Sequence, residues 1–86
     1  MSQETIEVNH PEGLHARPAA EFVKLANRFK STITLRLNGR QANGKSIMSV
    51  LALGAEAGMR VDVEIQGDDA DEAMQALKTF LAGRSA

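Results

Sequence analysis

Hydrophobic and polar residues alternate in three short segments of the chain, and each alternation predicts a strand with one buried face. The first segment covers residues 5–9, and the second begins at Thr32. The third covers residues 61–66 and shows the clearest alternation. The apolar positions of these segments are Ile6, Val8, Ile33, Leu35, Leu37, Val61, Val63 and Ile65.

The dipeptide Asn38-Gly39 follows the second alternating segment directly. Asn-Gly between two extended segments is typical of a two-residue β-hairpin turn. We therefore expect a return strand over residues 40–43. Because this strand is short and has few apolar residues, we predict that it lies at an edge of the sheet.

Apolar residues recur every three or four positions from residue 16 to residue 30, which predicts a helix with one buried face. Pro18 fits the first turn of this helix, where the missing N–H costs nothing. The helix therefore cannot begin much before Ala16. Its apolar face consists of Ala19, Phe22, Ala26 and Phe29, widened by Val23 and Leu25.

Two further helices are predicted nearer the C-terminus. Ser46 is a favourable capping residue for one of them, and Gly54 is suited to end it. The other helix covers residues 70–82. Asp69 and Glu72, at its start, have the spacing of a capping box, with Asp in the place of Ser or Thr.

The predicted order of elements is strand, helix, strand, strand, helix, strand, helix. Each strand has one apolar face, so a mostly antiparallel sheet with all helices on one face buries the apolar residues most economically. The other face of the sheet, rich in Thr, Glu, Asp and Arg, meets water. The fold class is therefore α+β.

Length and composition narrow the class of protein. The chain has 86 residues, 43% hydrophobic and 24% charged, with a formal net charge of -1, which suits one small domain over residues 1–86. The charge argues against nucleic acid as the main partner. Absence of cysteine excludes disulfides and thiolate metal sites.

The chain shows neither a secretory signal nor an apolar run long enough to cross a bilayer. We therefore expect a cytoplasmic protein that does not insert into membranes. A domain of this size has little room for a large substrate cleft of its own. Its size favours a carrier or a binding module over an autonomous enzyme.

His15 stands at the predicted start of the first helix, two residues before Arg17. An imidazole is a competent nucleophile, a helix start offers unpaired N–H groups, and arginine binds anions with two donors. Together these groups form a site for an anion on or near the His15 ring, and a phosphoryl group suits it because it is charged and can bond to a ring nitrogen. The residues alone do not exclude a surface histidine beside a solvated arginine.

Two neighbours of His15 carry weaker expectations. His10 and His15 do not have the spacing of a zinc-binding pair, and the carboxylate or thiolate ligands expected beside such a pair are missing. We therefore expect His10 in an exposed loop and expect no metal site. Glu12 is near enough to influence His15 through a loop contact, and the sequence does not decide whether it does.

Ser46 has two interpretations. As a helix cap it needs no other role. A phosphoryl group added to Ser46 would also meet the positive end of a helix, and Lys45 beside it would add to the attraction.

The helix after Ser46 has more apolar residues than one buried face can hold. Ile47, Met48 and Leu51 cannot all be buried beside Val50 and Leu53 in so short a helix. We expect some of them to form an exposed docking patch, because surface patches that contain Met often bind partners. The alternative is a helix that neighbouring elements cover on most sides.

Three segments, GLHARPAAEFV, SIMSVLALGA and the intervening TLRLNGRQANGKS, resemble the histidine-containing phosphocarrier (HPr) family of the bacterial phosphoenolpyruvate:sugar phosphotransferase system. The resemblance covers nearly the whole chain with matching spacing. It implies an open-faced β-sandwich, in which four antiparallel strands carry three helices on one face in the order βαββαβα.

The resemblance also implies the chemistry of the site. His15 would accept a phosphoryl group at Nδ1 from phosphorylated enzyme I and pass it to an enzyme IIA. Arg17 and the backbone amides of Ala16 and Arg17 would hold that group, without a cofactor. Such a protein is a carrier with a phosphohistidine intermediate rather than a free-standing enzyme. The family allows alanine at position 16, whereas Glu12 replaces an asparagine of well-known members.

The resemblance implies regulation and docking as well. Ser46 matches a serine that HPr kinase/phosphorylase modifies in many Gram-positive bacteria, where the product serves a catabolite-control transcription regulator. Relatives without this kinase also have the serine. Ile47, Met48 and Leu51 match the surface on which partners dock. A monomer is the simplest expectation.

Two alternatives remain open from the sequence. One is a carrier of the nitrogen-related phosphotransferase branch, which keeps the chemistry of His15 and has other partners. The other is an α/β module that binds RNA or a small effector without covalent chemistry. Absence of Trp and Tyr, strands without aromatic residues and the slight negative charge count against RNA.

Overall fold

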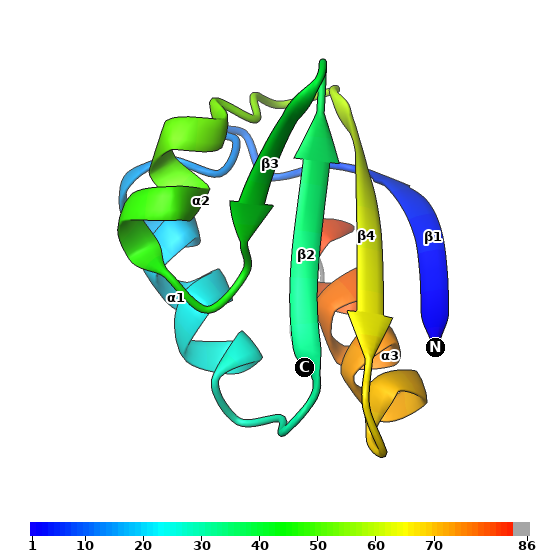
Figure 1. Cartoon of the computed structure of the whole chain (residues 1–86). Coiled ribbons are helices and arrows are strands. Elements are labelled where there is room, and N and C mark those ends of the chain that lie inside the picture. Colours follow the sequence, from blue (N-terminus) through cyan, green and yellow to red (C-terminus); the bar gives the residue numbers. More distant parts are fainter. Residues whose placement is uncertain (84–86) are drawn as a thin grey trace.

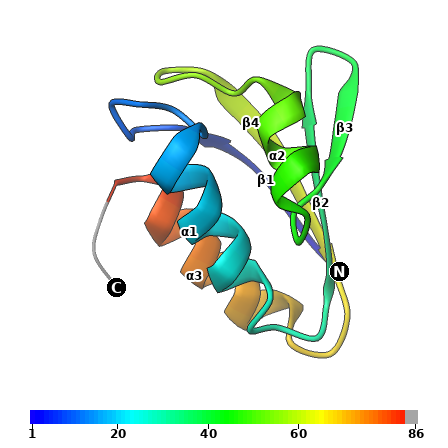
Figure 2. The same cartoon turned by 90° about the vertical axis from the view of Figure 1, so that its left-hand side faces the viewer.

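The computed structural model describes residues 1–83 as a four-stranded antiparallel sheet with three helices on one face (Figures 1 and 2). The order of strands is β1-β4-β2-β3. None of the helices within these residues is long and apolar enough to cross a membrane. The elements are β1 (Ser2–Glu7), α1 (Ala16–Ala26), β2 (Thr32–Leu37), β3 (Arg40–Asn43), α2 (Ile47–Leu53), β4 (Arg60–Gln66) and α3 (Ala70–Leu81). This arrangement confirms the predicted open-faced β-sandwich and its order βαββαβα.

The core lies between the sheet and the helices. Alternate residues of the strands point toward the helices, where Phe22 of α1 and Leu77 of α3 pack against them. Burying one large apolar side chain stabilises a fold by about 1.5–3 kcal/mol, so the alternation seen in the sequence sets which face is covered. The buried strand residues are Ile6, Ile33, Leu35, Ala42, Val61, Val63 and Ile65.

The hairpin between β2 and β3 turns at Asn38 and Gly39, as predicted. Both residues have positive φ, 52° and 80°, which is the geometry of a type I′ turn. β3 pairs only with β2 and lies at the edge of the sheet, with Ala42 as its one buried apolar residue.

Two elements have other bounds than predicted. β1 covers Ser2–Glu7 rather than residues 5–9, because β4 pairs with it from Ile65 to Arg60. α1 ends at Ala26, where the Asn27 side chain donates to the Val23 carbonyl at 2.9 Å and competes with continued helix. Phe29 still packs against the core from the following turn, which explains why it fits the helical spacing.

The predicted capping box at the start of α3 is wrong. The Asp69 side chain makes no capping hydrogen bond to α3. Its carboxylate instead accepts from the Lys30 N–H at 2.9 Å, from the Ser31 N–H at 3.0 Å and from the Ser31 hydroxyl. The hydrogen bond from Ser31, followed by that from the Lys30 N–H, lowers the Asp69 pKa. Asp69 therefore joins α3 to the segment that leads into β2.

Candidate functional site

His15 is the N-terminal cap residue of α1, at the point where the loop after β1 enters the helix (Figure 2). Its backbone is extended, with φ -125° and ψ 162°, and its side chain makes no capping hydrogen bond. The ring is half-buried, and the His15 carbonyl accepts from the Ala19 N–H at 3.4 Å. The backbone of His15 thus serves the helix while its imidazole stays available for chemistry.

Ala16, the first residue of α1, has a φ of 48°. An L-residue in this left-handed region costs of order 1–3 kcal/mol, and such residues cluster at functional sites. The sequence shows no sign of it, because alanine does not favour positive φ. The N–H groups of Ala16 and Arg17 lie in the first turn, where a helix provides no internal acceptor for them. These two amides can therefore donate to an anion.

Charge at the helix start comes from Arg17. Its side chain is exposed, and no hydrogen bond or ion pair to its guanidinium occurs within residues 1–83. The first turn of α1 contains no acidic residue. Glu12 is exposed too and makes no side-chain hydrogen bond to His15 in the described part of the chain. The positive charge of Arg17 is thus free to act on an incoming anion.

The residues just before His15 are held against the loop that follows α2. The Leu14 N–H donates to the Ala55 carbonyl at 2.8 Å, and the Leu14 side chain is fully buried. Gly13 has a φ of 68°, and a Cβ there would lie 2.7 Å from the Ala55 carbonyl oxygen and from Glu56 Cα. Glycine permits this close approach. No local pattern of residues indicates that residues 55 and 56 support the site.

His10 is not the exposed loop residue that we expected. Its ring is half-buried, its Nε2 lies 2.7 Å from the Phe80 carbonyl oxygen, and its centroid lies 4.6 Å from that of the Phe80 ring. The C-terminal end of α3 reaches this loop, where the Asn9 N–H donates to the Leu81 carbonyl at 2.8 Å. Pairing across 70 residues is invisible in a local pattern, which explains the error.

Ser46 caps α2 as predicted. Its hydroxyl accepts from the Ser49 N–H at 3.3 Å, and Gly54 ends the helix with a φ of 75°. Lys45, which precedes Ser46, makes a different contact in the unmodified chain. The Lys45 ammonium donates to the Phe29 carbonyl at 2.6 Å and so ties α2 to the turn after α1.

One face of α2 exposes apolar side chains. Ile47 is 37% exposed and Met48 72%, whereas Val50 and Leu53 are buried. Leu51 is half-buried against the core. We call Ile47, Met48 and Leu51 the α2 patch. Helices α1 and α2 are in contact, so the patch and His15 belong to adjoining elements.

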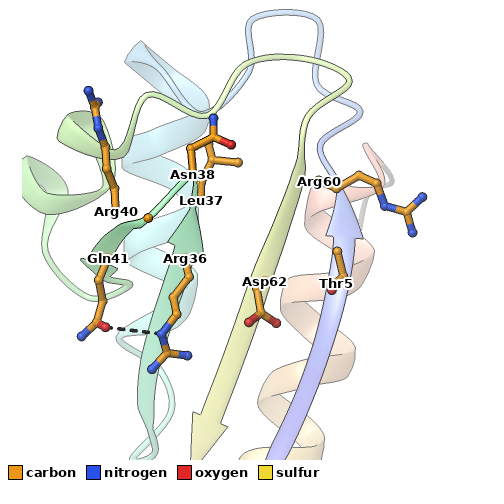
Figure 3. A pocket seen from close by; sticks show the side chains of 9 residues that line it. Thr5, Arg36, Leu37, Asn38, Arg40, Gln41, Arg60 and Asp62 are labelled. Carbon is orange, nitrogen blue, oxygen red and sulfur yellow. Dashed lines mark hydrogen bonds between the residues drawn. The ribbon is translucent and has the colours of Figure 1, made fainter.

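A separate hollow lies on the open face of the sheet and contains three arginines (Figure 3). Arg36 Nη1 donates to a Glu64 carboxylate oxygen at 2.9 Å, and this hydrogen bond lowers the Glu64 pKa. Arg36 Nε donates to the side-chain oxygen of Gln41 at 3.3 Å. Arg40 and Arg60 point away from each other in Figure 3. The guanidinium groups of this hollow therefore do not converge on one point.

An open-faced β-sandwich whose first helix starts at a histidine, with an arginine two residues later, has the arrangement of the histidine phosphocarrier class. The family model described as the PTS HPr component phosphorylation site matches residues 2–83. The chain belongs to the HPr family of the phosphotransferase system.

Individual relatives agree with this assignment. The chain is 40% identical over 84 residues to phosphocarrier protein HPr of Xylella fastidiosa, covering 98% of this chain and 94% of the relative. It is 42% identical over 81 residues to HPr-like protein Crh of Bacillus subtilis, covering 94% and 95%. A crystal structure of HPr from Thermoanaerobacter tengcongensis superposes with a TM-score of 0.92 at 39% identity over 100% of both chains.

Proposed function

We propose that this protein is a cytoplasmic phosphocarrier, in which His15 takes a phosphoryl group at Nδ1 from phosphorylated enzyme I and passes it to an enzyme IIA. The observation that carries the proposal is the His15 ring, which stands at a helix start without a capping bond beside the uncommitted charge of Arg17. Membership of the HPr family supports the same assignment.

The transfer is an in-line displacement at phosphorus. The Nδ1 lone pair of neutral His15 forms the new bond while the bond from phosphorus to the donor group of enzyme I breaks, and the donor group keeps that electron pair. Catalysis of such a step consists mainly of positioning and charge stabilisation. Arg17 and the N–H groups of Ala16 and Arg17 supply the charge and the donors. In a second in-line displacement, an acceptor group of enzyme IIA forms a bond to phosphorus while the bond from phosphorus to Nδ1 breaks. The electron pair of that bond returns to Nδ1, which regenerates free His15.

The α2 patch gives both partners a place to dock. Its exposed Met48 side chain adapts to different apolar surfaces because it is unbranched and polarizable. A carrier must release each partner before it meets the next, so a small patch suits the task better than a large one.

Transfer of label from phosphoenolpyruvate tests the proposal. Enzyme I and labelled phosphoenolpyruvate are incubated with wild type and with His15→Ala. We expect acid-labile label on wild type, none on His15→Ala, and onward transfer to an enzyme IIA. Absence of label on wild type with enzymes I from several bacteria would refute the carrier role.

Regulation at Ser46 is a second candidate function, favoured by the similarity to HPr-like protein Crh. A crystal structure of that relative is described as a catabolite repression protein. We propose that an HPr kinase/phosphorylase can modify Ser46 and that the product binds a catabolite-control regulator. Ser46 is half-exposed at the start of α2, where added negative charge meets the positive helix end.

An ATP-dependent kinase assay tests this regulatory site. We expect acid-stable label on wild type and on Ser49→Ala, and none on Ser46→Ala. Ser49 is a matched control because its hydroxyl lies on the same helix, where it accepts from the Asn43 N–H at 2.8 Å. Equal labelling of Ser46→Ala would place the phosphate elsewhere.

A further inference from the structure

We propose that His10 is a positioning residue for His15, which it serves by fixing the loop before His15 to the C-terminal end of α3. This inference rests on the proposed carrier function. In Figure 2 the loop after β1 passes over the end of α3, next to the start of α1. His10 lies in that loop, five residues before His15.

The side chain of His10 makes the anchor. Its Nε2 lies 2.7 Å from the Phe80 carbonyl oxygen, and a carbonyl only accepts, so Nε2 carries the proton. The ring also packs on the Phe80 ring with centroids 4.6 Å apart and an interplanar angle of 35°. The Phe80 ring in turn lies beside the ring of Phe22 in α1, with centroids 6.0 Å apart. The anchor thus reaches the helix that His15 caps.

The backbone of His10 continues the support toward His15. Its carbonyl accepts from the Gly13 N–H at 2.9 Å and closes a turn that has Pro11 in its second position. Leu14 then bonds to Ala55 as described above. The segment from His10 to His15 is therefore held at its first residue by the His10 side chain, and in its middle by the N–H groups of Gly13 and Leu14.

The anchor is separate from the surfaces that bind partners. The contacts of the His10 side chain are to α3, and none of those described involves the α2 patch. Loss of the anchor should displace the His15 ring from its productive position while docking is unchanged. The maximal rate should then fall while the KM of enzyme I for the carrier stays the same, a separation that general destabilisation does not produce.

The test compares His10→Ala and His10→Gln with wild type in steady-state transfer from enzyme I. Glutamine is the conservative variant because its amide can donate to the Phe80 carbonyl in place of Nε2. Ser31→Ala is the matched control, since it breaks the bond to Asp69 at the opposite end of α3. We expect kcat with His10→Ala to fall about tenfold, because small misplacements of reacting groups slow the reaction. KM should stay within about twofold of the wild-type value.

We expect His10→Gln to recover most of kcat and Ser31→Ala to keep it. Unchanged kcat in His10→Ala, an equal fall in Ser31→Ala, or no recovery in His10→Gln would each overturn the proposal. Amide hydrogen exchange of Gly13 and Leu14 gives a reading that needs no enzyme I, and we expect it to accelerate in His10→Ala. Failure of the carrier function itself would give a different result, because wild type would then take up no label from phosphoenolpyruvate and enzyme I.

Discussion

Ala16 has one of two positive φ values among the non-glycine residues of positions 1–83, and the other belongs to Asn38 in the hairpin turn. Asparagine tolerates this conformation well, whereas alanine does not. The surroundings therefore hold Ala16 in place, and the buried Leu14 and the close packing of Gly13 are the contacts nearest to it in sequence. Rigid support of this kind keeps the first amides of α1 in a fixed direction.

Arg17 is the residue whose replacement should separate chemistry from folding. We expect Arg17→Ala to lower kcat/KM for transfer from enzyme I by about 10²-fold, the effect typical of losing one donor to transition-state charge. Its unfolding free energy should stay within about 0.5 kcal/mol of wild type, because the side chain is exposed and unpaired in the described structure. Labelling kinetics and urea titration measure the two quantities.

Two further variants control the Arg17 experiment. Arg17→Lys keeps the charge and loses the two-donor geometry, so it should recover only part of the rate. Lys24→Ala removes an exposed positive charge from the last turn of the same helix and should transfer at nearly the wild-type rate. A rate for Arg17→Ala close to wild type would mean that the helix start alone stabilises the phosphoryl group.

At the scale of elements, Asp69 connects α3 to the segment between α1 and β2 through three accepted hydrogen bonds. These bonds lower its pKa. A carboxyl group of this kind stabilises the fold above its unfolded pKa and loses that contribution as pH falls through its folded pKa. Asp69→Asn should therefore unfold at lower urea than wild type at pH 7, and the difference should shrink below about pH 4.

Urea titrations at stepped pH measure this difference. Asp68→Asn removes the same charge from the exposed neighbouring residue, so its unfolding should stay close to that of wild type at every pH. If Asp68→Asn lost as much stability as Asp69→Asn, then net charge rather than the three hydrogen bonds would be the cause.

The helix α2 divides its residues between core and surface, so docking can be changed without harm to the fold. We expect Met48→Asp to raise the KM of enzyme I about tenfold, because an exposed apolar anchor becomes charged. Stability should change by less than about 0.5 kcal/mol, since Met48 is 72% exposed. Steady-state transfer kinetics measure the KM.

Gln75→Asp is the matched control for Met48→Asp, since it places the same charge on an exposed position of α3. Its KM should equal that of wild type. A wild-type KM in Met48→Asp would show that partners bind another surface.

For the molecule as a whole, both edges of the sheet disfavour pairing with a second copy. β3 is only four residues long, and β1 carries Glu4 and Glu7. The exposed apolar surface of α2 is small beside the roughly 800 Å² per partner of a stable interface. We expect sedimentation velocity at micromolar concentration to show one species with the mass of a single chain.

A dimer in that experiment would contradict this expectation. It would resemble the relative Crh, one crystal structure of which is described as a swapped dimer. Dilution would then distinguish a reversible complex, which dissociates, from exchanged strands, which separate slowly.

Most of the fold could be predicted because its causes are local. The alternation around Val61 to Ile65 and the Asn38-Gly39 turn depend on residues within a few positions of one another. The same holds for Ser46 as the cap of α2. The errors fall where the partner is remote in sequence: Asp69 accepts from Ser31, 38 residues away, and His10 bonds to Phe80, 70 residues away.

The sequence by itself determined the order of elements, the buried faces and the residues that resemble an acceptor site at His15 and Arg17. Backbone propensity and side-chain period act over a few residues, so they can be seen in the chain. Only the tertiary structure decided that Ala16 adopts a positive φ, that residues 55 and 56 support the loop, and that His10 binds the end of α3. These features depend on which distant segments meet when the core closes, and no local pattern records that.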